Sequence, residues 1–308
     1  MTGKILLAIL AGLANVLIVL LLAPLFEGIL RKVTAKLQSR QGPPIRQPYF
    51  DLLKLLGKED IESGEVPLMQ RFAVYLSLGT ILTVAWLVPM GASAPLNDAS
   101  DVVLLVYLLA LCGISTMLAG LAAGSTYSLL GISREMMSVI TLEPLFVIAV
   151  VIGSTHVGSL RLDTVFSGSV YAASHFPWSG LIMLAVMLLS FQAFVQRIPF
   201  DTAEAETELM EGPMMEYSGP KLALLKYAQM AKLVIYSALF VALFFPWGQG
   251  WMFPLNVVWF WAKVFLLVIL VTLVAATHAR YRIDQVIRYY AVLVVIALFA
   301  LLLAGLGY

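Results

Sequence analysis

Long apolar stretches recur along this chain, and they constrain its fold more than any other feature. A bilayer core about 30 Å thick needs roughly 20 apolar residues for a helix to cross it. Charged and helix-breaking residues divide the sequence into eight such stretches. They lie at about 5–30, 72–90, 102–123, 134–153, 179–197, 221–246, 254–277 and 285–307.

The composition supports the same interpretation. Of the 308 residues, 61% are hydrophobic and only 12% are charged, whereas a soluble domain is roughly 25% charged. We therefore predict an all-α integral membrane protein, a single polytopic domain over residues 1–308 with about eight transmembrane helices. A net charge of +1 gives no electrostatic reason to expect binding to nucleic acid.

The distribution of basic residues predicts an orientation in the membrane. If residues 31–71 are cytoplasmic, every Lys and Arg except Lys4, Arg161 and Lys263 lies on that side. An even number of crossings then places both termini outside. The predicted cytoplasmic loops are about 31–71, 124–133, 198–220 and 278–284.

The segment RQPYFDLLKLLGKED predicts a cytoplasmic amphipathic helix after the first span. Pro48 suits the first turn of a helix, and Phe50, Leu53 and Leu56 share one face. This pattern is typical of a helix that lies in the membrane interface. It is equally compatible with a surface on which a partner docks.

The segment PFDTAEAETELMEGPMMEYSGP, residues 199–220, is the acidic segment. It contains no Lys or Arg, and its carboxylates are Asp201, Glu204, Glu206, Glu208, Glu211 and Glu216. The first two fit a capping box at the start of a helix, and on that helix Glu204, Glu208 and Glu211 would share a face. Crowded carboxylates raise one another's pKa and share protons. We expect proton handling here, with a solvated acidic loop as the alternative.

Two further charges are predicted inside membrane spans. Glu143 lies about two helical turns beyond Glu135 on roughly the same face, and Pro144 weakens the helix there. Ionisable groups within the bilayer are costly and usually functional, although a structural carboxylate bonded to a neighbouring helix remains the alternative. Lys263 is the second such charge, and its alternative is a side chain that extends to the interface.

Templates for catalysis and metal binding find no match in the sequence. A single cysteine, Cys112, excludes a cysteine-ligated iron–sulfur cluster, and the histidines at 156, 175 and 278 lack metal-ligand spacing. There is no P-loop and no nucleophile elbow. We expect no cofactor or metal in this chain and no catalysis by the chain alone.

Four motifs carry a resemblance to a known family: SRQGPPIRQPYFDLLKLLGKE, GISREMMSVITLEP, RIPFDTAEAETELMEGPMMEYSG and ARYRIDQV. Together they resemble the membrane subunit shared by respiratory complex I (its subunit 1, or H) and the energy-converting, group 4 membrane-bound nickel–iron hydrogenases. SREMMSVITLEP, LKYAQMAK and FPWGQG look more like the hydrogenase branch, whereas YRIDQ is shared with complex I.

The resemblance implies a subunit of the cell membrane that anchors a redox arm and couples it to proton or sodium movement. The implied partners are hydrogenase large and small subunits, an iron–sulfur subunit and antiporter-like membrane subunits; the nickel–iron centre and the clusters would lie in these partners. The ion-coupling candidates are Glu135, Glu143, Asp201, Glu204, Glu206, Glu208, Glu211, Glu216 and Lys263. The partner-docking or cavity candidates are Arg40, Gly42, Pro43, Gln47, Pro48, Asp51, Lys54 and Arg134.

Three alternatives stay open. One is the quinone-site subunit of a complex I-type NADH dehydrogenase, and another is a passive membrane anchor. A stand-alone secondary transporter suits buried charges, but it suits neither the crowded cytoplasmic acids nor the absence of an internal repeat.

Overall fold

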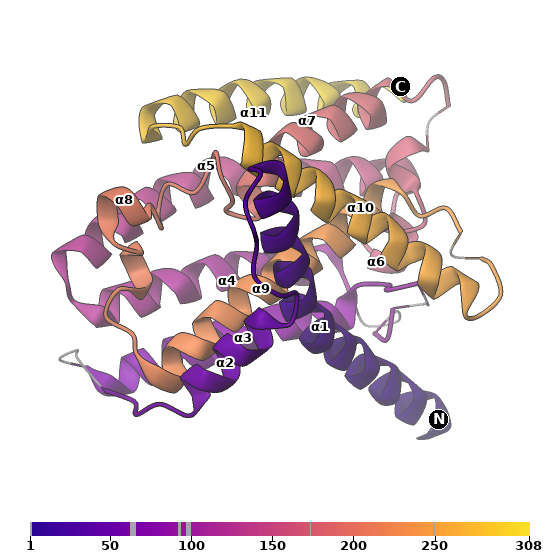
Figure 1. Cartoon of the computed structure of the whole chain (residues 1–308). Coiled ribbons are helices and arrows are strands. Elements are labelled where there is room, and N and C mark those ends of the chain that lie inside the picture. The colour runs from indigo at the N-terminus through magenta and orange to yellow at the C-terminus, as the bar shows by residue number, and fades with distance from the viewer. Residues whose placement is uncertain (1, 62–65, 92–93, 97–99, 173, 249) are drawn as a thin grey trace.

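Helices make up the regular structure of the chain in the computed structural model, which describes residues 2–61, 66–91, 94–96, 100–172, 174–248 and 250–308 (Figure 1). The longer ones are α1 (Thr2–Leu37), α2 (Gln47–Leu56), α3 (Pro67–Leu87), α4 (Val102–Ala123), α5 (Thr126–Val157), α7 (Trp178–Phe194), α9 (Gly219–Phe244), α10 (Leu255–Thr277) and α11 (Ile283–Gly305). Single turns form α6 (Leu162–Val165), η1 (Ser169–Tyr171), α8 (Glu206–Leu209) and η2 (Gly212–Met214).

The predicted class, an all-α integral membrane protein, is confirmed. Within the described residues, seven helices are long and apolar enough to cross a membrane, namely α1, α3, α4, α5, α9, α10 and α11. The remaining predicted span, 179–197, corresponds to α7, whose 17 residues stand at the lower end of the length needed to cross.

The predicted loop at 124–133 is mostly helical, and this is a correction. Gly124 ends α4 in a left-handed conformation (φ 73°), and α5 begins two residues later at Thr126. The hydroxyl of Ser125 accepts a hydrogen bond from the amide of Ser128 at 3.2 Å, which caps the new helix. The small and polar residues that suggested a connector therefore form a cap and a first helical turn.

Helix α9 lies at the centre of the bundle. In its most apolar stretch, 83% of the residues are buried, against 28% for α1 and α11. It packs against α1, α2, α3 and α10, while α11 packs on α5 and α7. Polar side chains on α9 are consequently held inside the protein.

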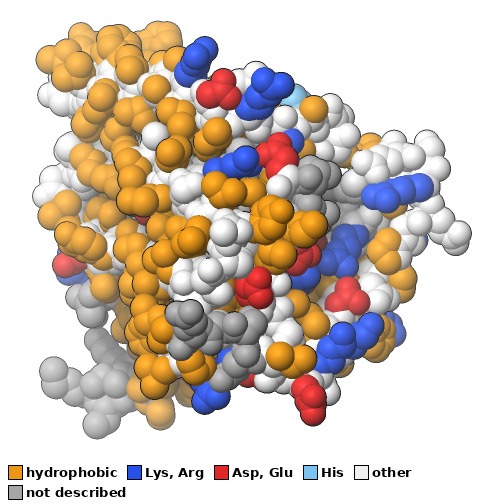
Figure 2. Space-filling model, turned by 90° about the vertical axis from the view of Figure 1, so that its left-hand side faces the viewer, with side chains coloured by type: hydrophobic (Ala, Val, Ile, Leu, Met, Phe, Trp, Pro, Cys, Tyr) orange, Lys and Arg blue, Asp and Glu red, His pale blue; other side chains and the backbone are white. Residues whose placement is uncertain are grey.

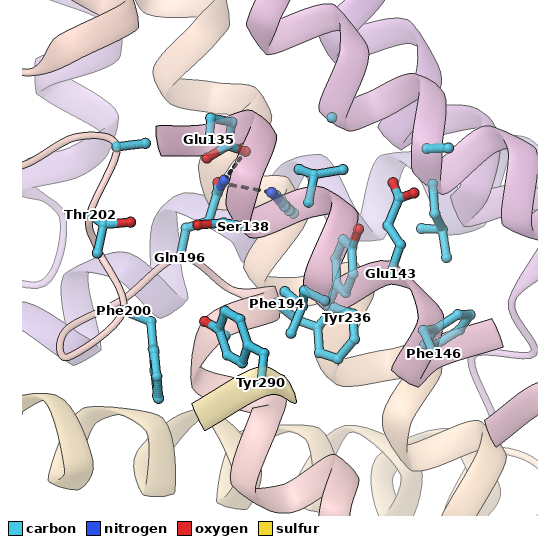
Figure 3. A pocket seen from close by; sticks show the side chains of 18 of the residues that line it. Glu135, Ser138, Glu143, Phe146, Phe194, Gln196, Phe200, Thr202, Tyr236 and Tyr290 are labelled. Carbon is cyan, nitrogen blue, oxygen red and sulfur yellow. Dashed lines mark hydrogen bonds between the residues drawn. The ribbon is translucent and has the colours of Figure 1, made fainter. Parts of the chain in front are cut away.

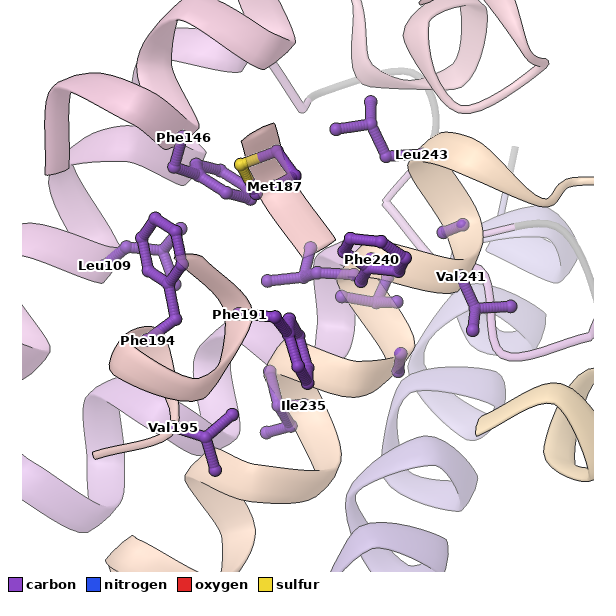
Figure 4. Close-up of a cluster of buried hydrophobic side chains, with 14 of the residues drawn as sticks. Leu109, Phe146, Met187, Phe191, Phe194, Val195, Ile235, Phe240, Val241 and Leu243 are labelled. Atoms are coloured by element: carbon purple, nitrogen blue, oxygen red, sulfur yellow. The ribbon is translucent and has the colours of Figure 1, made fainter. Parts of the chain in front are cut away.

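Aromatic side chains fill the core where α4, α5, α7 and α9 meet (Figure 4). Phe191 of α7 meets Phe240 of α9 edge to face with ring centroids 5.2 Å apart, and Phe146 of α5 meets Phe194 of α7 in the same way at 6.1 Å. Such pairs stabilise more than their buried area alone. They fix α5 and α9 next to the end of α7, from which the acidic segment begins.

Charged and apolar side chains occupy different parts of the surface. Figure 2 shows Lys, Arg, Asp and Glu gathered on one part of the face, beside a broad band of hydrophobic side chains. Figure 1 shows both chain ends on one side of the molecule and α8 toward the opposite side. The acidic segment thus lies at one end of the helix bundle.

Candidate functional site

Aromatic rings hold the start of the acidic segment against α11. Phe200 packs against Tyr281, Tyr289 and Tyr290, with ring centroids 5.5, 5.3 and 5.4 Å apart. The backbone amide of Tyr281 also donates to the carbonyl of Pro199 at 3.0 Å. These contacts fix where the segment leaves α7 and thereby position the carboxyl groups that follow.

The acidic segment is not the helix that the capping-box pattern predicts. The residues before Glu206 are irregular, and α8 is a single turn. Met210 and Glu211 then adopt left-handed backbone angles, with φ of 50° and 71°, which end the helix. The capping-box prediction is wrong because Asp201 pairs instead with Arg280 of the α10–α11 loop at 2.9 Å.

Cations from distant parts of the chain pair with other carboxylates of the segment. Arg134 of α5 donates to Glu208 at 2.6 Å, and this hydrogen bond lowers the pKa of Glu208. Lys226 of α9 lies 3.6 Å from Glu211. The predicted common helical face of Glu204, Glu208 and Glu211 is therefore not formed, because each meets a different partner.

Glu204 has a different environment. The side-chain amide of Gln229 on α9 donates to it. Burial, together with the nearby charges of Asp201 and Glu135, raises the pKa of Glu204 to about 8, so this carboxyl is mostly protonated at neutral pH. Glu216 lies half-buried further along. The side chain of Glu206 is outside the described part of the structure.

A cavity of about 60 Å³, the smaller cavity, lies between α4, α5, α9, α11 and the start of the acidic segment. Figure 3 shows Glu135 and Glu143 at this cavity, both from α5, with Gln196 bonded to Glu135. Between them Ser138 Oγ is buried and has no hydrogen-bond partner among the described residues. Most of the lining is apolar, but the carboxyl, amide and hydroxyl groups give the cavity a polar part, and its volume has room for water. The predicted pair, Glu135 and Glu143, therefore shares one cavity.

A second cavity of about 480 Å³, the larger cavity, lies between α1, α9 and the ends of α7 and α10. Its wall includes an ion cluster at the end of α1. Glu27, 6% exposed, binds both Arg31 at 3.3 Å and Arg197. Arg31 also pairs with Asp51 of α2 at 3.0 Å. These ion pairs tie α1, α2 and the end of α7 together.

The two cavities are neighbours. Four residues line both of them, and we call these residues the partition: Gln196, Asp201, Glu204 and Lys232. Lys232 Nζ donates to Gln196 Oε1 at 2.8 Å, and the amide nitrogen of Gln196 donates to Glu135. Hydrogen bonds thus run from α9 through the partition to α5.

The first group of predicted docking or cavity residues lines a third cavity. Arg40, Gly42 and Pro43 enclose about 270 Å³ beside α1. A Cβ atom on Gly42 would lie 2.6 Å from the Cβ of Ala35, so a larger residue does not fit there without movement. The carbonyl of Gly42 accepts a hydrogen bond from Lys32 at 3.3 Å.

The second group belongs to α2. Pro48 is buried, whereas Lys54 is exposed. Gln47 donates to Asp51 at 2.9 Å, which orients the carboxylate toward Arg31. These residues connect α2 to the larger cavity through the ion cluster.

Lys263 is separate from these cavities. Its Nζ donates to the carbonyls of Phe245 at 2.5 Å and Trp247 at 2.7 Å. A cation suits the carbonyl end of a helix, and here it caps the end of α9. The structure thus places Lys263 apart from the carboxyl groups with which the sequence grouped it.

Two partition residues, Lys232 and Gln196, were missed by the sequence reasoning. Lys232 was counted among cytoplasmic cations because it lies near the start of a span. Its signal was its depth, because it stands more than three helical turns inside α9. Gln196 gave no signal beyond a polar residue at the end of a span.

The described residues contain no group of three or more His, Cys, Asp or Glu side chains that could hold a metal ion. The polar groups that line the two cavities are carboxyl, amide, hydroxyl, guanidinium and ammonium groups, and the rest of the smaller cavity is lined mostly by apolar side chains. These groups exchange protons and bind water, so proton transfer is the chemistry that this arrangement suits.

Fold and site together define a multi-pass membrane protein with ionisable groups enclosed in its helix bundle. A family model described as NADH dehydrogenase matches residues 10–305, and the chain belongs to this family.

The relatives of this chain are subunits of respiratory-type complexes. The chain is 36% identical to hydrogenase-4 component C of Escherichia coli (strain K12), with 88% of each chain covered, and 35% identical to formate hydrogenlyase subunit 4 of the same strain, with 79% of each covered. It is 34% identical to the H subunit of NADH-quinone oxidoreductase of Anaplasma phagocytophilum (strain HZ), with 84% of each covered. The chain is therefore a membrane subunit of a respiratory-type complex.

A solved structure supports the fold. The chain matches a chain of the membrane-bound sulfane sulfur reductase, an archaeal respiratory membrane complex, with a TM-score of 0.85. The match covers 96% of this chain and 99% of that one at 24% identity. At this identity, the comparison concerns architecture alone.

Proposed function

We propose that this chain is the membrane-anchor and coupling subunit of an energy-converting hydrogenase. In this account it holds a peripheral redox arm and links its turnover to proton or sodium movement through membrane carboxyls. The nickel–iron centre and iron–sulfur clusters belong to partner subunits. Antiporter-like membrane subunits receive the coupling signal.

The observation that carries the proposal is the pair of adjoining cavities. Carboxyl groups line a route that begins at the acidic segment, passes the partition and reaches Glu143 within α5. A carboxyl group inside a membrane protein is held near the balance between its charged and neutral forms, so a nearby change of charge shifts that balance. A redox arm docked at the acidic segment is able to supply such a change.

Each candidate has a role in this account. Glu135 and Glu143 accept the proton inside the membrane, and Asp201 and Glu204 connect them to the larger cavity. Glu208, with Arg134, and the other acids of the segment respond to the docked arm. The α1–α2 region, including Arg40, Gly42 and Asp51, contacts that arm.

The quinone-site alternative depends on the larger cavity. Its volume of about 480 Å³ lies within the usual range for small-molecule sites, but those sites are mostly apolar. This cavity is lined by several charged side chains, including Arg31, Arg197 and Glu204. The lining therefore favours water and ions over a quinone ring.

The orientation follows from the basic residues and is part of the proposal. We place the acidic segment in the cytoplasm and both termini outside the cell membrane. The lipid bilayer contacts the apolar band of Figure 2.

The test replaces Glu143 with Gln in the complete complex, isolated through a tag on this chain. Gln has nearly the same shape and forms hydrogen bonds, but it does not exchange a proton. We expect metal analysis to find nickel and iron in the complex, redox turnover with an artificial electron carrier to continue, and ion uptake into inverted vesicles to be lost. The control is Glu59→Gln, at an exposed position. Normal ion uptake by Glu143→Gln would refute the coupling role.

The same isolation tests the alternatives. Nickel absent from the complex and a redox arm that reduces quinone would establish the quinone-site function instead. If Glu143→Gln does not assemble, Glu143→Asp is measured in its place. Loss of assembly with Asp as well would show that Glu143 is a structural carboxyl.

A further inference from the structure

Lys232 is the only Lys or Arg among the described residues that line the smaller cavity. The same cavity is lined by Glu135, Glu143 and Glu204, and also by Asp201, which already has Arg280 as its cation. Apart from Asp201, three carboxyl groups and one ammonium group therefore share this space.

Neutral amides, rather than cations, bind two of these carboxyl groups. Gln196 donates to Glu135, and Gln229 donates to Glu204. An amide satisfies a hydrogen bond without neutralising a charge, whereas an unpaired buried charge is strongly destabilising. The single ammonium group of Lys232 compensates one carboxylate, so ionising a second would leave a charge unpaired.

The position of Lys232 suits this shared role. It extends from the central helix α9 and belongs to the partition, so it faces both cavities. Its Nζ donates to Gln196, lies 5.7 Å from the ring centroid of Tyr236, and acts electrostatically on all three carboxyl groups. The hydrogen bond to a neutral amide holds the ammonium group between the acids without assigning it to one of them.

We propose that Lys232 is the shared counter-ion of Glu135, Glu143 and Glu204, so that one negative charge moves among these carboxyls as protons move between them. This inference rests on the proposed function. In each step, an O–H bond breaks at one carboxyl and an O–H bond forms at another. The donor becomes the carboxylate, and the total charge of the cavity is unchanged.

The other groups that face Lys232 do not replace it. Tyr236 of α9, Cys112 of α4 and Tyr290 of α11 are neutral when protonated. Arg197, on the side of the larger cavity, also acts electrostatically on Glu204, but it already binds Glu27 as its ion-pair partner. Removal of the Lys232 charge thus leaves the three carboxyl groups without a cation of their own.

The test compares Lys232→Gln and Lys232→Arg in the complete complex, in inverted vesicles. An opposite charge at short range shifts a pKa by about 1 unit or more. We therefore expect Lys232→Gln to lower the number of ions moved per turnover about tenfold near neutral pH. The pH at which the remaining coupling is half-maximal should be about 1 unit higher than in the wild type. Lys232→Arg should restore both the number of ions moved per turnover and this pH. Lys36→Gln, which removes an exposed lysine charge, is the control.

Each other outcome is decisive. Unchanged coupling in Lys232→Gln overturns the shared counter-ion, and so do equal losses in Lys232→Gln and Lys232→Arg. In either case the proposed function still holds if Glu143→Gln fails to move ions. Normal ion movement in Glu143→Gln rejects the proposed function itself. If Lys232→Gln does not assemble, Lys232→Gln combined with Glu204→Gln should assemble, because it also removes one of the carboxyl groups that lose their cation. Failure of that double variant also overturns the inference.

Discussion

At the residue scale, Glu204 shows how the fold changes the chemistry of a carboxyl group. Its neighbours in sequence are other acids and small residues, yet its hydrogen-bond partner is Gln229 of α9. Burial raises its pKa to about 8, whereas Glu208, four residues later, has its pKa lowered by Arg134. One acidic segment therefore holds a carboxyl that keeps its proton and another that readily loses it.

The raised pKa predicts how stability depends on pH. Between the ordinary value of 4.5 and about 8, the folded protein binds one more proton at Glu204 than the unfolded chain does. This contribution to stability is fully present below about pH 4.5 and is lost as the pH rises through about 8. Thermal unfolding of the purified complex should thus show less pH dependence across this window in Glu204→Gln than in the wild type.

Glu208→Gln is the matched control for this measurement. The pKa of Glu208 is lowered, so its own contribution to stability changes only below the ordinary value for a glutamate. An equal pH dependence in the wild type and in Glu204→Gln would contradict the protonated state assigned to Glu204.

At the element scale, a close backbone contact sets the position of the α1–α2 connection. A Cβ atom on Gly28 of α1 would lie 1.9 Å from the carbonyl oxygen of Ile45. No side chain fits at that distance, so glycine allows the connection to lie directly on α1. The third cavity and the ion cluster around Glu27 depend on this arrangement.

Two helical glycines provide a comparison. Gly28→Ala should destabilise the protein by about 1–3 kcal/mol because the connection must move away. Gly79→Ala, in α3, meets nothing within 4 Å and should stabilise the helix by about 0.5–1 kcal/mol. Thermal unfolding of the purified variants measures both, and a Gly28→Ala variant as stable as Gly79→Ala would contradict the close packing.

The sequence predicts most of the helices because hydrophobic length alone defines a membrane span. It does not predict that α5 begins at Thr126. Gly124 ends α4 and Ser125 caps α5, but these residue types are also typical of loops. The acidic segment is predicted as acidic but not in its conformation. Its shape depends on Arg280, Arg134, Lys226 and Gln229, which are distant in sequence.

At the scale of the whole molecule, the central helix α9 contributes both to the hydrophobic core and to the partition between the two cavities. It closes the core with Phe240, and it brings Gln229 and Lys232 to the partition. Helix α9 also contacts α1, α2, α3 and α10, so it joins the partition to most of the bundle.

The central claim is that redox turnover and ion movement are linked through Glu143, and an uncoupler tests it most directly. In sealed inverted vesicles an ion gradient opposes the turnover that builds it. Addition of an ionophore for protons or sodium should therefore accelerate redox turnover of the wild-type complex and leave Glu143→Gln unaffected. Equal acceleration of the wild type and Glu143→Gln would contradict the account, because ion movement would then proceed without this carboxyl.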